Sequence, residues 1–158
     1  MCSFISTLNG DNMNNYHNCL NILLVDDSED DVLMAEKAFS QISFPHKLET
    51  VMSSQDALDY LLCRRKYAAR KAILPDMLLL DINMPLMDGF ALLKILKADQ
   101  LLKKIPVIML TSSSVREDIT RSYECGAASF ITKPGSFEGF KSLIKDFGKY
   151  WLTISALP

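Results

Sequence analysis

Polar residues that could do chemistry together stand at the ends of four apolar runs in this sequence. They are the carboxylates Asp26, Asp27 and Asp81, the hydroxyl of Thr111 and the ammonium group of Lys133. Carboxylate oxygens are ligands that divalent cations prefer, and an ammonium group can pair with phosphoryl oxygens. If the fold brings these groups to one place, the combination suits a divalent cation together with a phosphoryl group.

The apolar runs themselves predict a parallel sheet. They are rich in Ile, Leu and Val and bounded by polar residues, which is typical of strands that helices cover on both faces. We expect strands near positions 22, 48, 77, 106 and 129, alternating with helical patterns in five βα units. The predicted fold is α/β, a flavodoxin-like doubly wound sheet of five parallel strands in the order 2-1-3-4-5. Ligands of such sheets sit beyond the carboxyl ends of the strands, where all five polar residues would lie.

Composition and charge are those of one ordinary globular domain. The chain has 158 residues, of which 49% are hydrophobic and 23% are charged, with a net charge of -2. This balance gives no electrostatic reason to expect nucleic acid or an anionic membrane as a partner. The apolar runs are too short to span a membrane, and the N-terminus lacks a signal-peptide pattern, so we expect a cytoplasmic protein.

Three segments follow from the patterning along the chain. Residues 1–20 have no periodicity and many turn formers, and we expect a flexible arm there. Residues 21–152 form the predicted domain, and residues 153–158 form a short tail. Basic residues crowd the segment from Arg64 to Lys71, which fits either a solvated loop or a nucleic-acid patch. The acidity of the whole chain favours the loop.

Four motifs stand in order along the chain: Asp26-Asp27, the stretch from Asp81 to Gly89, Thr111-Ser112 and Lys133-Pro134. Together they resemble the receiver domains of two-component response regulators. The match covers roughly residues 21–151, and the four motifs together at this spacing are very specific. The segment 63–75 and the ending 150–158 look more like the stand-alone regulators paired with phytochrome-type histidine kinases than like chemotaxis regulators.

The resemblance implies roles for the acidic residues. Asp81 would take a phosphoryl group from a phosphohistidine on a sensor histidine kinase and form an aspartyl phosphate. Mg²⁺ would be held by Asp27, Asp81 and the backbone carbonyl of Asn83, and Asp26 would act through water. Such a protein is not an enzyme, apart from its self-catalysed phosphotransfer and autodephosphorylation.

The remaining motif residues would stabilise and report the phosphorylated state. By resemblance, Lys133 pairs with Asp81 and then with the phosphoryl oxygens, while Thr111 donates its hydroxyl to one of them. Thr111 and the strand-five aromatic, here Phe130, would form the switch. The resemblance also implies that the bond before Pro134 is cis.

The resemblance leaves the output of the signal open. We expect it to pass through protein contacts to a downstream target or a phosphotransfer protein, and relatives of this type often form homodimers. A phosphorelay intermediate that passes phosphate onward would have the same motifs. A scaffold with the same fold and no phosphorylation is the main competitor. A phosphatase of the haloacid dehalogenase type would need an aspartate where this chain has Asn83.

Overall fold

The computed structural model describes residues 19–112 and 115–153 of the chain. Its five parallel strands form one sheet in the order β2-β1-β3-β4-β5, which confirms the predicted topology. The strands are β1 Leu20–Val25, β2 His46–Val51, β3 Met77–Asp81, β4 Val107–Thr111 and β5 Ser129–Thr132. The chain reverses its direction across the sheet between β1 and β3, and this is where doubly wound sheets bind ligands.

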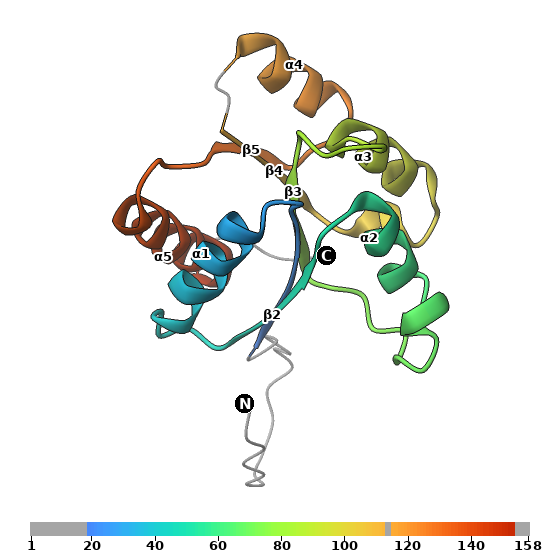
Figure 1. The fold of residues 1–158 in the computed structure, drawn as a ribbon, viewed down its shortest axis with the longest axis horizontal. Coiled ribbons are helices and arrows are strands. Elements are labelled where there is room, and N and C mark those ends of the chain that lie inside the picture. The colour runs from blue at the N-terminus through green and yellow to red at the C-terminus, as the bar shows by residue number, and fades with distance from the viewer. Residues whose placement is uncertain (1–18, 113–114, 154–158) are drawn as a thin grey trace, which may run out of the picture.

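Helices cover both faces of the sheet (Figure 1). They are α1 Glu29–Ser40, α2 Ser54–Leu61, α3 Gly89–Ala98, α4 Arg116–Glu124 and α5 Phe137–Thr153, with short 3-10 turns η1 Arg65–Tyr67 and η2 Leu102–Lys104. Side chains of α1 and α5 pack with one face of the sheet. Side chains of α2 and α3 pack with the other face.

The inner strand β1 shows why the apolar runs are continuous. Leu23 and Val25 belong to the core cluster on the α2 and α3 side, whereas Ile22 and Leu24 belong to the cluster on the α1 and α5 side. Successive side chains of a strand point to opposite faces, so a strand covered on both sides needs apolar residues at consecutive positions, as from Ile22 to Val25. The first polar position after such a run therefore marks the edge of the sheet.

Side-chain caps start the helices close behind the strands. The Ser28 hydroxyl accepts a hydrogen bond from the backbone N–H of Asp31 at 3.3 Å. Ser53 caps α2 in the same way, and the Asp88 carboxylate caps α3 through Ala91. Each such cap contributes about 1 kcal/mol of helix stability. The caps fix where each helix leaves the strand ends, and so they shape the edge that carries the polar residues.

The structure shifts the predicted boundaries slightly. β1 begins at Leu20, a buried residue inside the segment predicted as an arm, because its side chain packs in the α1 and α5 cluster. Residues 1–18 of that predicted arm lie outside the described residues. α5 ends at Thr153, and the remainder of the predicted tail also lies outside them. In the part of the chain that the structure describes, no helix has the length and apolar character to cross a membrane.

Candidate functional site

The three predicted carboxylates meet at the carboxyl edge of the sheet. Asp81 is the last residue of β3, and Asp26 and Asp27 directly follow β1, its neighbour in the sheet. One carboxylate oxygen from each residue lies within 4.8 Å of the other two. Asp26 is only 2% exposed and Asp81 is 5% exposed. Three acidic groups this close, two of them withdrawn from water, repel one another unless a cation lies between them.

A glycine lets helix α3 start directly behind Asp81. A Cβ atom added to Gly89 would lie 2.3 Å from the backbone oxygen of Asp81, far closer than packing allows. The backbone N–H of Gly89 donates to the carbonyl of Ile82 at 2.9 Å and so closes the loop between β3 and α3. This close approach fixes the backbone that carries the Asp81 carboxylate.

Lys133 brings its ammonium group into the acidic cluster from the end of β5. Its Nζ lies 2.5 Å from Asp26 Oδ2, 2.8 Å from Asp31 Oδ2 and 3.1 Å from Asp81 Oδ1. The side chain is 11% exposed, so the contacts are made largely out of water. The sequence predicted the pairing with Asp81. It did not predict that Asp26 and Asp31 would be nearer.

The pKa values reflect this arrangement. Burial raises the pKa of Asp81 above its ordinary value of 3.8, and the neighbouring carboxylates of Asp26 and Asp27 add to that effect, while Lys133 opposes it. Burial alone would lower the pKa of Lys133, but its hydrogen bonds to Asp26 and Asp31 raise that pKa well above the ordinary 10.5. Lys133 therefore stays protonated at neutral pH. Ionisation of Asp81 is less favourable in the folded protein than in water.

Asp31 is the site residue that sequence reasoning missed. In the sequence it indicates only an acid near the start of a helix, where the positive end of the helix dipole favours negative charge. A signal was present, because Asp31 lies four residues before the buried Ala35 and so shares the helix face that turns toward the sheet. In the first turn of α1, that helix face lies next to the carboxyl edge of the sheet.

Thr111 and Phe130 lie beside the acidic cluster on neighbouring strands. Thr111 is the fully buried last residue of β4, and its carbonyl accepts a hydrogen bond from the backbone N–H of Lys133 at 2.7 Å. Phe130 pairs in register with Met109 of β4 and packs, half-buried, against the core cluster of α2 and α3. Their proposed switch role concerns movement and stays a prediction.

Two further expectations concern the loops around the site. Asn83 is an exposed residue of the loop after β3, and the ligand role of its carbonyl stays a prediction. The described part of the chain contains no cis peptide bond, so the bond before Pro134 is trans and the expectation of a cis bond is wrong for this structure. The trans form is intrinsically favoured by roughly 0.5–1 kcal/mol before proline. With this isomer Lys133 already reaches the carboxylates.

The basic segment is largely bonded within the chain. Arg65 and Lys66 form ion pairs with Asp59 and Asp56 of α2, at 3.4 and 2.9 Å. The Arg70 guanidinium lies 3.7 Å from the centre of the Tyr60 ring, and it donates to the carbonyls of Tyr60 and Ile73.

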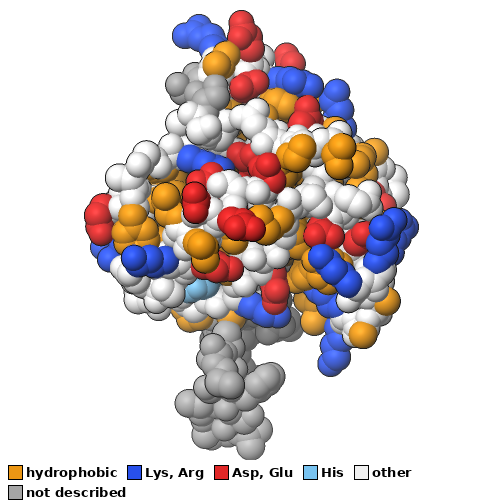
Figure 2. Space-filling model, viewed as in Figure 1, with side chains coloured by type: hydrophobic (Ala, Val, Ile, Leu, Met, Phe, Trp, Pro, Cys, Tyr) orange, Lys and Arg blue, Asp and Glu red, His pale blue; other side chains and the backbone are white. Residues whose placement is uncertain are grey.

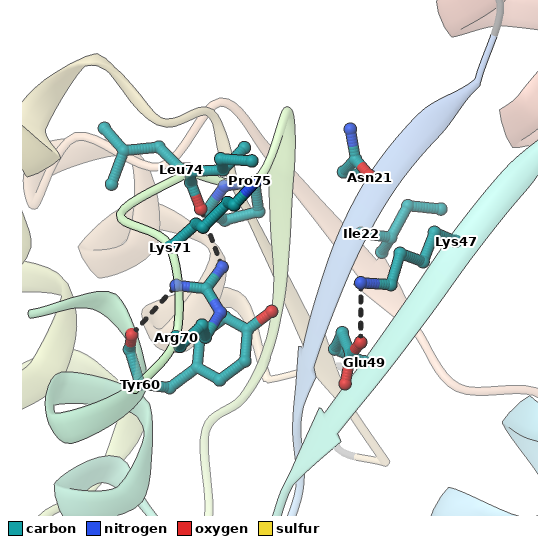
Figure 3. A pocket seen from close by; sticks show the side chains of 10 residues that line it. Asn21, Ile22, Lys47, Glu49, Tyr60, Arg70, Lys71, Leu74 and Pro75 are labelled. Carbon is teal, nitrogen blue, oxygen red and sulfur yellow. Dashed lines mark hydrogen bonds and ion pairs between the residues drawn. The ribbon is translucent and has the colours of Figure 1, made fainter. Parts of the chain in front are cut away.

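Arg70, Tyr60 and Ile73 form one wall of a cavity of about 260 Å³, and the Lys47–Glu49 ion pair of β2 lies on the opposite wall (Figure 3). On the face drawn in Figure 2, acidic side chains lie near the middle and groups of basic side chains lie toward the rim. The bonding within the segment favours the structural loop over a nucleic-acid patch.

Comparison with known proteins identifies the family to which this architecture belongs. The sequence matches the response regulator receiver domain over residues 22–145. The chain belongs to the response regulator receiver family. It is 35% identical to the probable methanogenesis regulatory protein FilR2 of Methanothrix harundinacea over 87% of this chain and 86% of that protein. The predicted resemblance is confirmed.

Solved structures of phytochrome response regulators share this fold. The phosphorylated cyanobacterial phytochrome response regulator RcpA is 34% identical, with a TM-score of 0.80 over 88% of this chain and 98% of that one. The Mn²⁺-bound form of response regulator Rcp1 is 29% identical, with a TM-score of 0.78 over 88% of this chain and 99% of that one. Rcp1 comes from Synechocystis. The similarity to single-domain regulators of this type is therefore confirmed along with the fold.

Proposed function

We propose that this receiver domain accepts a phosphoryl group on Asp81 from a sensor histidine kinase and passes the signal on through protein contacts. The observation that carries the proposal is the Asp81 carboxylate itself. It ends a buried central strand, lies beside two further carboxylates, and has one oxygen 3.1 Å from a buried ammonium group. A nucleophile, a charge that can pair with phosphoryl oxygens and a candidate metal site thus occupy one edge of the sheet.

The residues of the chain have distinct tasks in such a transfer. One oxygen of Asp81 attacks phosphorus, and the bond from phosphorus to the imidazole nitrogen of phosphohistidine breaks. The electron pair of that bond leaves with the histidine, which takes up a proton. Lys133 offers positive charge to the oxygens of the transferred group, and the Thr111 hydroxyl donates a hydrogen bond to one of them. Neither residue takes part in a covalent step.

The donor set fits a divalent cation, and we propose Mg²⁺. Oxygen ligands from three clustered carboxylates match the preference of this ion, and such an ion would neutralise charge on the transferred phosphoryl group. Asp27, Asp81 and the carbonyl of Asn83 would hold it. Both Asp26 oxygens already accept hydrogen bonds, from Lys133 and from the backbone N–H of Ser28. This supports contact of Asp26 with the metal through water.

The proposed partners follow from the relatives. RcpA is a phytochrome response regulator, which supports a phytochrome-type histidine kinase as the phosphoryl donor here. Homodimer formation, and a downstream target or phosphotransfer protein, belong to the same proposal. Movement of Thr111 toward the phosphoryl group and inward rotation of Phe130 would carry the change of state, as a population shift between two packings.

Phosphoryl uptake from acetyl phosphate tests the proposal without the kinase. With Mg²⁺ present, we expect one added phosphoryl group by intact mass, and no addition with EDTA. Asp81→Asn abolishes the uptake, whereas Asp30→Asn, on the exposed side of α1, leaves it unchanged. Uptake that persists in Asp81→Asn would overturn the assignment. A folded wild-type protein that binds no Mg²⁺ and takes up no phosphate would instead favour the scaffold.

A further inference from the structure

We infer that Asp31 is a positioning residue that holds Lys133 back from the phosphoryl site and so sets how readily the lysine engages a phosphoryl group. The inference rests on the proposed function of Asp81. It starts from the contact between the first turn of α1 and the end of β5, which joins residues 102 positions apart in the sequence.

The three N–H donors of Lys133 face three carboxylates. Its ammonium group has no acceptor. Two of the donors form hydrogen bonds to Asp26 and Asp31, and the Asp81 oxygen lies farther away, at 3.1 Å. A phosphoryl group on Asp81 adds oxygens that also require a positive partner. Lys133 can serve them only if it gives up one of its present contacts.

Asp31 is the contact that is released most easily. The Asp26 side chain is 3% exposed and would be left as a buried charge without its cation, which is a costly state. The Asp31 side chain is 39% exposed, so water can solvate its carboxylate after the lysine leaves. Asp31 therefore competes with the phosphoryl group for the lysine, whereas Asp26 stays attached to it.

The packing beside this pair leaves room for the exchange. Asp31, Lys133 and Pro134 line a cavity of about 30 Å³, close to the volume of one water molecule. A water there can take over the hydrogen bond to Asp31 when Lys133 moves. Asp31 itself stays in place, because its backbone N–H is bonded to the Ser28 hydroxyl that caps α1.

Neutralising Asp31 removes the competitor and is the direct test. We would measure the affinity for beryllofluoride, a mimic of the phosphoryl group, by calorimetry in Mg²⁺, together with the rate of phosphoryl uptake from acetyl phosphate. Asp31→Asn is expected to bind the mimic several-fold more tightly and to take up phosphate faster. Asp30→Asn is the matched control, since it removes an acid from the same helix turn that makes no contact with Lys133.

The conservative variant separates this role from a general effect on the helix. Asp31→Glu keeps the charge and is expected to return both readouts to near the wild-type values. An Asp31→Asn protein that matches Asp30→Asn, or that binds the mimic more weakly, would overturn the inference. If the wild-type protein itself takes up no phosphate and binds no mimic, the failure belongs to the proposed function of Asp81 instead.

Discussion

Two partly buried lysines lie at opposite ends of the sheet and have opposite electrostatic surroundings. Lys133 at the carboxyl edge contacts three carboxylates, and these contacts raise its pKa against the effect of burial. Lys97, near the end of α3, donates to the carbonyls of Lys103 and Ile105 at 3.1 and 2.8 Å, close to the start of β4. Burial lowers its pKa.

The difference shows that the partners of a partly buried lysine, more than its burial, decide the direction in which its pKa moves. Neutral carbonyls satisfy the donors of Lys97 and tie η2 to α3, but they do not compensate its charge. Lys97 therefore serves as a cap for a loop. The carboxylates around Lys133 compensate its charge in excess, and this leaves negative charge for a divalent cation and a site for a charged ligand.

The largest expected effect comes from removing the cation at the carboxyl edge. Lys133→Met leaves Asp26 and Asp81 buried without their partner, and breaking a buried pair in this way costs roughly 3 kcal/mol. We expect that loss of unfolding free energy in urea at pH 7 with EDTA. Added Mg²⁺ should restore more stability to the variant than it adds to the wild type. Equal effects of Mg²⁺ on both proteins would mean that Lys133 and the metal do not share these carboxylates.

A smaller effect of opposite sign is expected at Asp81. Its pKa is raised in the folded protein, so the folded state favours the protonated form, and the stability that Asp81 contributes is lost as the pH rises through its folded pKa. Asp81→Asn should therefore be more stable than the wild type at pH 7 in EDTA, by about 1 kcal/mol, a usual scale for single substitutions.

The pH and the metal sharpen the test at Asp81. The stability advantage of the variant should disappear below pH 3.8, where the Asp81 carboxyl group is protonated in both the folded and the unfolded protein. It should also shrink when Mg²⁺ is added. A variant that is less stable than the wild type at pH 7 would show that attraction to Lys133 outweighs burial.

The smallest effect is expected at Lys97, where only neutral partners are lost. Lys97→Met should lower the unfolding free energy by about 0.5 kcal/mol, the lower end of the net contribution of one hydrogen bond. Because the pKa of Lys97 is lowered in the folded state, its contribution should increase as the pH rises through the folded pKa toward 10.5. The contribution of Lys133, whose pKa is raised, should instead fall above pH 10.5. Matching pH profiles for the two methionine variants would refute the contrast.

The sequence predicted the strands that carry the site better than the side-chain contacts within it. Continuous apolar runs and polar run ends located the strands and brought Asp26, Asp81 and Lys133 to one edge, because parallel strands share their carboxyl end. Which carboxylate lies nearest to Lys133 depends on rotamers and on the path of α1, and no local pattern encodes either. The contact of Asp31 therefore went unseen. The stacking of Arg70 on Tyr60 was missed for the same reason, since it depends on the path of an irregular loop.

The distance along the chain between Lys133 and its acidic partners has a consequence for synthesis. Asp26 is 107 positions and Asp31 is 102 positions before Lys133. Asp81 leaves the ribosome 52 residues ahead of the lysine (133 minus 81), an interval of roughly 3–10 s at ordinary translation rates. Pairing of β1 with β3 during that interval would bring three carboxylates together without the ammonium group that lies among them in the folded protein. The acidic edge therefore disfavours premature closure of the fold, and β5, the last strand to be made, completes the site.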